Sequence, residues 1–314
     1  MWRRLAVSVA IGISSGLLCW AMMRNLGLGA CDFNSALREA GELVAGRDPY
    51  TIFHGTPSYP LPAAIVGLAF IWVKPEIAAG LFFGTSSALL AFGLARQGYT
   101  RLLVFLAYPY WAAMLTVQWA PLIMASALLP WLLPVTTAKP QLGAPVFLTY
   151  LTKPGVVGCV LLLLASLLVI PNWPLRWLSG IGQFTHFVPL LALPGPALLL
   201  ALWRHQDRDS HLFLLSALAP QHWFYDSFIL WLIPKTRQEI LFTVCLSWGA
   251  GITRWYVIPR SWSQVGSWAV WWIYLPMLAV ILWRGTEGSR QEQQRLLLLK
   301  SQPTPTEPVA STEG

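Results

Sequence analysis

Long runs of apolar residues recur along the chain, separated by short segments that contain Pro, Lys, Gln or Arg. A transmembrane α-helix needs about 20 mainly apolar residues to cross the hydrocarbon core of a bilayer. Several runs approach or reach that length, namely 5–23, 76–95, 155–170, 188–203, 211–233, 240–257 and 265–283. We expect each of them to form a membrane-spanning helix.

A second set of apolar runs is shorter and is bounded by Pro, Lys or Gln. Its members are 61–73, 102–116, 122–135 and 142–151. Polar backbone at membrane depth is tolerated only where protein buries it or where it lines a wet cavity, so these runs predict broken or tilted helices around an internal cavity. Together the two sets predict an all-α polytopic membrane protein with about ten or eleven spans.

The chain divides by composition into two parts. Residues 1–285 contain the apolar runs and are expected to form one membrane domain. Residues 286–314 are polar and then rich in Pro, Thr and Glu, a composition that cannot bury a core. We expect this second part to be a partly disordered tail.

The overall composition agrees with lipid as the main solvent. Hydrophobic residues make up 56% of the chain and charged residues 11%, against about 25% charged residues in soluble domains. The formal net charge of +8 comes from Lys and Arg that are scattered singly, without the basic stripe that is typical of nucleic-acid binding. We expect these cations to contact anionic membrane lipids or lipid phosphates, and we expect no nucleic-acid partner.

The cysteines and histidines do not predict a metal site. None of the 4 cysteines has a CxxC spacing, and the 5 histidines lack the spacing of metal ligands. We therefore expect neither a metal nor another cofactor.

The positive charges near the N-terminus bear on orientation. Arg3 and Arg4 precede the first apolar run and favour a cytoplasmic N-terminus, which places segment 24–60 outside. Arg24, Arg38 and Arg47 fall in this outer segment. If every short run crosses the membrane fully, Arg96 and Arg101 also fall outside. In that case the charge distribution does not confirm the topology.

Segment 24–60 is the longest non-apolar stretch between predicted spans, and it has the pattern of an amphipathic helix. Asp32 stands at an N-cap position, and Gly46 ends the run before Pro49. One apolar stripe at helical spacing consists of Ala36, Leu37, Ala40, Leu43 and Val44. The pattern predicts a helix on the outer membrane surface, with Glu39 and Glu42 on its solvated face.

The position of Asp32 suggests chemistry. Its carboxylate is expected at the mouth of the membrane domain, where a general base can take a proton from a hydroxyl if a phosphate leaving group binds opposite it. The alternative is a simple helix cap, which stabilises a helix by about 1 kcal/mol. Asp48, before Pro49, has the pattern of a turn residue.

Several motifs, in their serial order, resemble the GT-C mannosyltransferases that use polyprenyl-phosphate-mannose, the glycosyltransferase 87 family. In the first outer loop they are Asp32-Phe33, Gly46-Arg47-Asp48-Pro49-Tyr50 and Tyr59-Pro60-Leu61-Pro62. Further on they are Gln118, Ala138-Lys139-Pro140, Ala219-Pro220 and Tyr225-Asp226. The chain departs from the family where Val117 replaces a usual Gly, where Pro121 replaces Asn, and in its short length.

The resemblance implies a GT-C fold and a reaction on the outer face of a bacterial inner membrane. It implies that Asp32 is the catalytic residue, that a polyprenyl-phosphate sugar, with mannose favoured, is the donor, and that a lipid or glycan is the acceptor. Asp32 would deprotonate the acceptor hydroxyl, and a β-linked donor would give an α-linked product by inversion. The residues expected to contact donor phosphate or sugar are Lys139, His222, Asp226, Arg38, Gln118, Tyr50 and Tyr59.

Simpler interpretations exist for some of these residues. His222 and Asp226 are four apart on a predicted helix and can form a local pair on one face. Ionisable groups at membrane depth are costly, however, which favours a functional role. Lys139 can be a residue whose charged end reaches the membrane surface from a helix end, like Lys153 before Pro154.

Two other functions stay open. Broken helices and a membrane-depth His/Asp pair also suit a small-molecule or lipid transporter, which inverted internal symmetry would favour and the amphipathic outer segment disfavours. The second is a non-catalytic subunit with a GT-C-like fold. A cavity at Asp32 that is filled by side chains would favour it.

Overall fold

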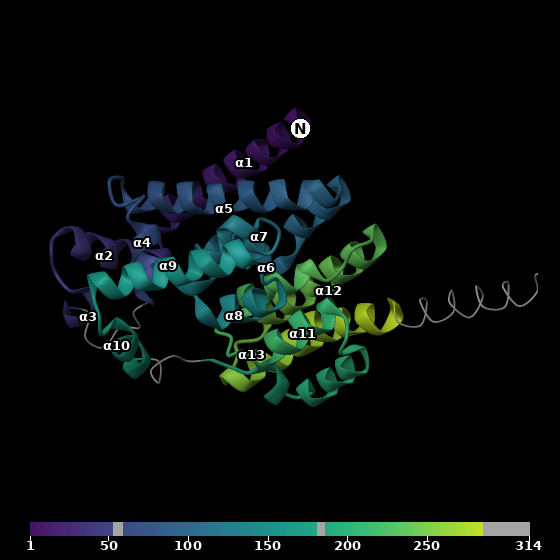
Figure 1. Cartoon of the computed structure of the whole chain (residues 1–314). Coiled ribbons are helices and arrows are strands. Elements are labelled where there is room, and N and C mark those ends of the chain that lie inside the picture. Colours follow the sequence, from purple (N-terminus) through teal and green to yellow (C-terminus); the bar gives the residue numbers. More distant parts are fainter. Residues whose placement is uncertain (53–58, 181–185, 285–314) are drawn as a thin grey trace, which may run out of the picture.

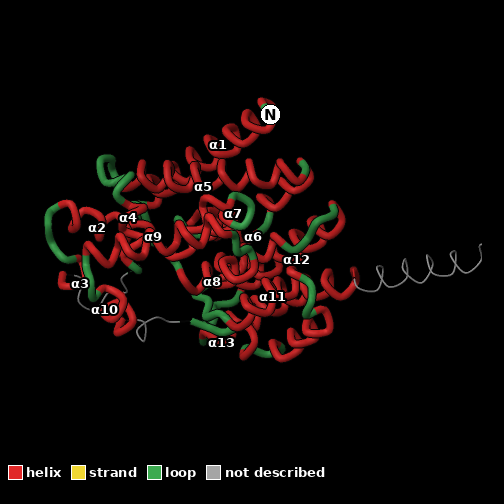
Figure 2. The backbone as a smooth tube through the Cα atoms, in the orientation of Figure 1, coloured by secondary structure: helices red, strands yellow, loops and turns green. Residues whose placement is uncertain are grey.

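The structure is all-α, and many of its helices are short (Figure 1, Figure 2). It is a computed structural model that describes residues 1–52, 59–180 and 186–284. Within these ranges the β-type pairing is one isolated bridge between Phe187 and Gln221. The tail predicted at 286–314 lies outside the described residues.

The helices follow one another along the whole described chain. The α-helices are α1 (Trp2–Leu26), α2 (Phe33–Val44), α3 (Pro49–Ile52), α4 (Leu61–Gly67), α5 (Pro75–Gln97), α6 (Tyr108–Leu115), α7 (Ala120–Ser126), α8 (Pro140–Thr149), α9 (Lys153–Val169), α10 (Trp173–Gly180), α11 (Arg208–Leu218), α12 (Arg237–Tyr256) and α13 (Trp262–Ala269). The 3₁₀ elements are η1 (Tyr99–Leu106), η2 (Pro130–Ala138), η4 (Pro189–Leu191), η5 (Gly195–Arg204) and η6 (Phe224–Leu232), and η7 (Val270–Tyr274) is a π-helical turn.

Three helices of the described residues are long and apolar enough to cross a membrane. They are α1, α5 and the continuous helix Trp262–Arg284, which contains α13 and η7. The pair α9 and α10 passes the same test together but is bent by 94°, which gives up to four candidate spans. The helices confirm the all-α class and fit a membrane location, whereas the expected ten or eleven spans are not shown.

Two predicted spans are not single helices. Run 188–203 is divided between η4 and η5, with Pro194 between them, and run 211–233 is interrupted around Pro220 between α11 and η6. Proline has no backbone N–H to donate, and it also restricts the residue before it, so a helix tends to stop there. The prediction of uninterrupted helices at these two runs was wrong for that reason.

The short, proline-bounded runs behave as predicted, because each forms short helices rather than one long helix. Run 102–116 breaks at Ala107 between η1 and α6. Helix α7, which overlaps the start of run 122–135, is buried along its full length. The other short helices are buried in part, whereas Leu115, Trp131 and Leu148 are exposed. These helices surround the candidate site described below.

Helices α1 and α5 are antiparallel and pack through glycines. A Cβ added to Gly16 would lie 2.7 Å from the Gly80 carbonyl oxygen, and one added to Gly12 would lie 2.9 Å from that of Gly84. At the end of α5, the Tyr99 ring centroid lies 5.5 Å from the Arg3 guanidinium carbon. The C-terminal end of α5 is therefore beside the N-terminal end of α1.

This arrangement changes the expected distribution of charge. If every short run crossed the membrane, Arg96 and Arg101 would lie at the opposite end of the α1–α5 pair from Arg3. They lie at the same end as Arg3. The reason is that α4 does not cross. It is short and packs on α2, where Gly67 approaches the backbone of Ala36.

We expect Gly84→Ala to destabilise the protein by about 1–3 kcal/mol, since overpacking a close helix contact forces backbone shifts of this cost. A Cβ at Gly84 would lie 2.8 Å from the Gly12 oxygen and 3.0 Å from the Gly16 Cα. Thermal unfolding in detergent measures the effect. Gly41→Ala on α2, where no atom lies within 4 Å of the added Cβ, is the control and should not lower the unfolding temperature. Equal behaviour of the two variants would contradict the close packing.

Candidate functional site

Helix α2 positions the first residue of the site. Of its predicted apolar stripe, Ala36, Leu37 and Ala40 are buried, whereas Leu43 is partly buried and Val44 is exposed. Phe33, which precedes the stripe, is fully covered. The Phe33 ring stacks on Phe82 of α5 at 3.9 Å between centroids, and Trp119 meets both rings edge-on. These aromatic contacts fix the N-terminal end of α2, where Asp32 lies, against the interior of the protein.

Asp32 does not cap α2 with its side chain. Its carboxylate oxygen Oδ2 instead accepts a hydrogen bond from the Gln118 side-chain amide, and the Tyr225 hydroxyl lies 3.5 Å from the same oxygen. The Asp32 backbone N–H also donates to the Thr116 carbonyl at 3.3 Å. The interpretation of Asp32 as a simple cap was wrong, because its acceptor is used by residues from distant parts of the chain.

Lys139 joins these groups to a second carboxylate. Its ammonium donates to Gln118 Oε1 at 2.7 Å and to Asp226 Oδ1 at 2.9 Å, and it lies 5.0 Å from the centroid of the Tyr225 ring. The side chains of Lys139 and Asp226 are 4% and 0% exposed. We call Asp32, Gln118, Lys139, Tyr225 and Asp226 the Asp32–Asp226 network. An ion pair this deeply buried is costly to break, because a lost partner leaves an unpaired charge.

His222 lies beside the network but not on a helix with Asp226. Residues 221–223 form a loop before η6, and the backbone N–H of His222 donates to Asp226 Oδ2 at 2.8 Å. The prediction that the two residues share one helical face was wrong, because Pro220 interrupts the helix just before His222. The half-buried imidazole lies 5.1 Å from the Trp262 ring and 6.3 Å from the Tyr225 ring.

Two residues next to the network have an unfavourable backbone conformation. Cys31, directly before Asp32, has φ of 45°, and Val117, directly before Gln118, has φ of 51°. Side chains other than Gly rarely adopt this left-handed region, and for a β-branched residue such as Val it is an outlier. Strain of this kind concentrates at functional sites. Glycine adopts a positive φ without this cost and would therefore fit the backbone at position 117.

Tyr59 and Tyr50 approach the site from the segment after α2. The Tyr59 N–H donates to Glu39 Oε1 at 3.0 Å, and the Tyr50 hydroxyl donates to the Tyr59 carbonyl at 2.8 Å. Loss of hydration raises the pKa of the Tyr59 phenol well above its usual value, and the nearby carboxylates of Asp32 and Asp226 raise it further. Tyr59 is therefore close to the network, while Tyr50 supports it through the backbone.

Glu39 is a residue that the sequence placed wrongly. It was expected on the solvated face of α2, but it is 2% exposed, and its Oε2 has no hydrogen-bond partner among the described residues. Burial raises the pKa of Glu39 to about 8. The helical spacing could have predicted this burial. Glu39 lies three residues after Ala36 and four before Leu43, and residues at these spacings share one face of a helix.

The remaining predicted residues lie farther out. Arg38 is on the exposed side of α2, where its charge acts on Glu39 and Glu42. Asp48 accepts the N–H of Tyr50 at 2.9 Å and pairs with Arg176, which ties α3 to α10. The described residues contain no group of three or more His, Cys, Asp or Glu side chains that could hold a metal ion.

Two cavities of the described residues lie away from Asp32. One is beside Arg101 and the other beside Trp111, and neither is lined by Asp32. The open cavity expected next to Asp32 stays a prediction.

Comparison of the chain with protein-family models, with curated proteins and with solved structures gave no match. The arguments about function therefore rest on the geometry and chemistry of the site.

We expect Lys139→Met to destabilise the protein by about 3–5 kcal/mol, because it leaves the buried Asp226 carboxylate without its cation. The double variant Lys139→Met/Asp226→Asn removes the unpaired charge and should recover part of this loss. Thermal unfolding in detergent measures both. Lys153→Met is the matched control, since Lys153 also precedes a proline but is exposed. If Lys139→Met unfolds at the same temperature as Lys153→Met, the buried pair contributes no stability.

The stability of the protein should depend on the ionisation of Glu39. Its pKa is raised from 4.5 to about 8 in the folded protein, so the folded state binds the proton more tightly than the unfolded state does. Stability is then highest below about pH 4.5 and falls as the pH rises towards 8.

Glu39→Gln should lose this part of the pH dependence and unfold at a higher temperature than the wild type at about pH 8.5, by a few degrees. Unfolding temperatures measured between about pH 5 and pH 9 test this. Glu42→Gln, on the same helix but paired with Arg47 at the surface, should keep the slope of the wild type. An unchanged slope in Glu39→Gln would refute the raised pKa.

Proposed function

We propose that the chain is a membrane glycosyltransferase that moves a sugar, mannose being favoured, from a polyprenyl-phosphate donor to a lipid or glycan acceptor. One observation carries the proposal. Asp32, Gln118, Lys139 and Asp226 lie far apart in the sequence yet meet in one hydrogen-bonded network. They are also the positions at which the sequence resembles the polyprenyl-phosphate-dependent enzymes.

Asp32 is the general base in this proposal. It is only half-buried, whereas Asp226 is fully covered and paired with Lys139. The bonds from Gln118 and Tyr225 reach Oδ2, and Oδ1 would accept the proton of the acceptor hydroxyl. The hydroxyl oxygen forms a bond to the anomeric carbon, the bond from that carbon to the phosphate oxygen breaks, and the phosphate leaves with the electron pair.

Lys139 takes a different part from the one the sequence suggested. In this geometry its ammonium is already bonded to Gln118 and Asp226 and is 4% exposed. It fits a residue that positions Gln118, and through it Asp32, better than one that binds phosphate directly. His222 and Arg38 are the residues proposed to stabilise the phosphate as its negative charge develops.

The proposed orientation places the reaction on the outer side of a bacterial inner membrane. Arg3, Arg4, Arg96 and Arg101 belong to one end of the α1–α5 pair, which the positive-inside rule makes cytoplasmic. Asp32 follows the other end of α1. A lipid-linked donor suits that side because it needs no soluble nucleotide sugar.

We expect Asp32→Asn to lower sugar transfer by about 10² to 10⁴-fold, the contribution of a general base, while the protein stays folded. The measurement is incorporation of labelled mannose from polyprenyl-phosphate-mannose into membrane lipids. Asp48→Asn is the matched control, since Asp48 lies in the same segment and pairs with Arg176. It should keep most of the activity.

Full activity of Asp32→Asn would exclude Asp32 as the base. No transfer by the wild-type protein from this donor to any membrane lipid would argue against a mannosyltransferase and for a non-catalytic subunit or a transporter. Uptake of substrate into sealed vesicles would then identify the transporter.

A further inference from the structure

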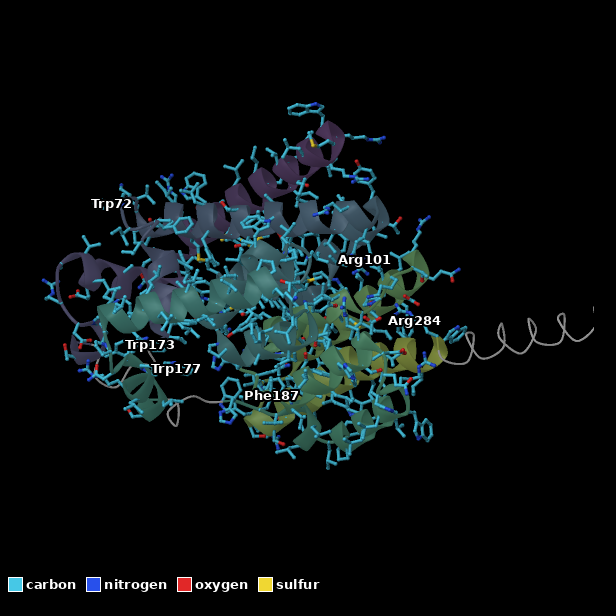
Figure 3. All side chains as sticks on the ribbon, viewed as in Figure 1. Trp72, Arg101, Trp173, Trp177, Phe187 and Arg284 are labelled. Carbon is cyan, nitrogen blue, oxygen red and sulfur yellow. The ribbon has the colours of Figure 1, made fainter. Side chains whose placement is uncertain are left out.

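A second polar region lies at the end of the molecule opposite α2. Arg101 and Arg284 lie towards this end, while Trp72, Trp173 and Trp177 lie towards the other (Figure 3). Arg101 is in η1, directly after α5, and so shares the end of the α1–α5 pair with Arg3. The region is therefore separate from the Asp32–Asp226 network.

Two carboxylates of this region are already bound by cations. Arg284 donates to Asp209 at 2.7 Å and to Glu239 at 2.5 Å, and Lys235 donates to Asp209 at 2.9 Å. With Arg101 and Arg208 the region has four positive charges and two negative ones, a net charge of +2. Two positive charges remain uncompensated by these carboxylates.

A cavity of about 220 Å³ opens beside these side chains. Its lining includes three cationic residues and no carboxylate, and it consists of Gln97, Arg101, Ala127, Leu128, Tyr150, Arg208, Leu232 and Lys235. The Arg208 guanidinium carbon lies 5.2 Å from the centroid of the Tyr150 ring, which holds it at the cavity. The polar groups of the lining are therefore mainly hydrogen-bond donors.

Arg101 is the strongest indication of a ligand. It is 4% exposed, and its Nη2 donates to the carbonyl oxygens of Trp231 and Leu232, both at 3.3 Å. Its Nε and Nη1 are buried and have no hydrogen-bond partner among the described residues. Buried charged donors without acceptors are costly, and Arg101, which carries two of them, is one of the residues that line the cavity.

We propose that this cavity binds a phosphate-bearing anion. Guanidinium groups match phosphate oxygens with two parallel donors, and the Gln97 amide and the Tyr150 hydroxyl can add further bonds. A water molecule takes about 30 Å³ in the liquid, so the cavity holds one phosphate group and a few waters. Either inorganic phosphate or the head group of an anionic phospholipid offers this chemistry. The proposal does not depend on the glycosyltransferase reaction.

The test uses the purified full chain. Unfolding temperatures are measured in detergent with sodium phosphate and with sodium chloride at equal ionic strength, and retained lipids are counted by native mass spectrometry after reconstitution with phosphatidylglycerol or phosphatidylcholine. Arg208→Gln removes an exposed cation of the cavity, and Arg101→Gln removes the buried one. Arg96→Gln is the matched control, because Arg96 is an exposed arginine at the same end that does not line the cavity.

We expect phosphate, phosphatidylglycerol or both to bind the wild type, and we expect Arg208→Gln to bind about tenfold more weakly, a factor that corresponds to 1.4 kcal/mol. Arg96→Gln should bind like the wild type. Stabilisation by phosphate identifies a soluble anion, and selective retention of phosphatidylglycerol identifies a lipid head group. Binding of neither probe, or equal weakening by Arg208→Gln and Arg96→Gln, would overturn the proposal. Because Arg208 is exposed, its variant gives a result even if Arg101→Gln does not fold.

Discussion

The buried ammonium of Lys139 is the group on which the arrangement of the candidate site depends. A charged lysine in the interior needs acceptors, and here it has Gln118 Oε1 and Asp226 Oδ1. Because the amide oxygen of Gln118 faces Lys139, its nitrogen faces Asp32. One cation therefore sets the direction of the Gln118 amide and, through it, the N–H donor that holds the Asp32 carboxylate in place.

The backbone adapts to this requirement at some cost. Cys31 and Val117 adopt left-handed conformations directly before Asp32 and Gln118. The Asp32 N–H donates to the Thr116 carbonyl and so joins the two segments. A non-Gly residue in such a conformation costs on the order of 1–3 kcal/mol. The stacked rings of Phe33 and Phe82 with Trp119 offset this locally by packing. The polar network and the aromatic cluster thus form one unit that orders the loop after α1.

The sequence predicted the class of fold and much of the network, but not how the chain is broken. Hydrophobic runs located α1, α5 and the helix Trp262–Arg284, whose length and composition are local properties. Run 188–203 is as apolar as these helices. Only Pro194 in the middle of the run indicated that it would not form a single helix. Helix propensity is a property of the local sequence, whereas the number of membrane crossings depends on how the helices pack. Helix α4, for example, packs on α2.

The predicted site residues separate in a similar way. Motif order placed Asp32, Gln118, Lys139 and Asp226 in one site, and the structure brings these four together. Tyr225 also belongs to the site, although only its motif partner Asp226 had been expected to contact the donor. The sequence does not show which groups a side chain donates to. Lys139 was therefore expected to bind the donor phosphate, because its two acceptors in the protein, Gln118 and Asp226, are distant in the chain.

The continuous helix Trp262–Arg284 has a consequence for how the two ends of the protein relate. It has 23 residues, and at about 1.5 Å per residue it is about 35 Å long, enough to cross a bilayer core of about 30 Å. Its first residue packs against His222, and its last one binds Asp209 and Glu239. The π-helical turn Val270–Tyr274 adds a residue to one turn and so sets the rotational phase between these two ends. A rotation of this one helix would therefore move Trp262, beside His222, and Arg284, beside Asp209, together.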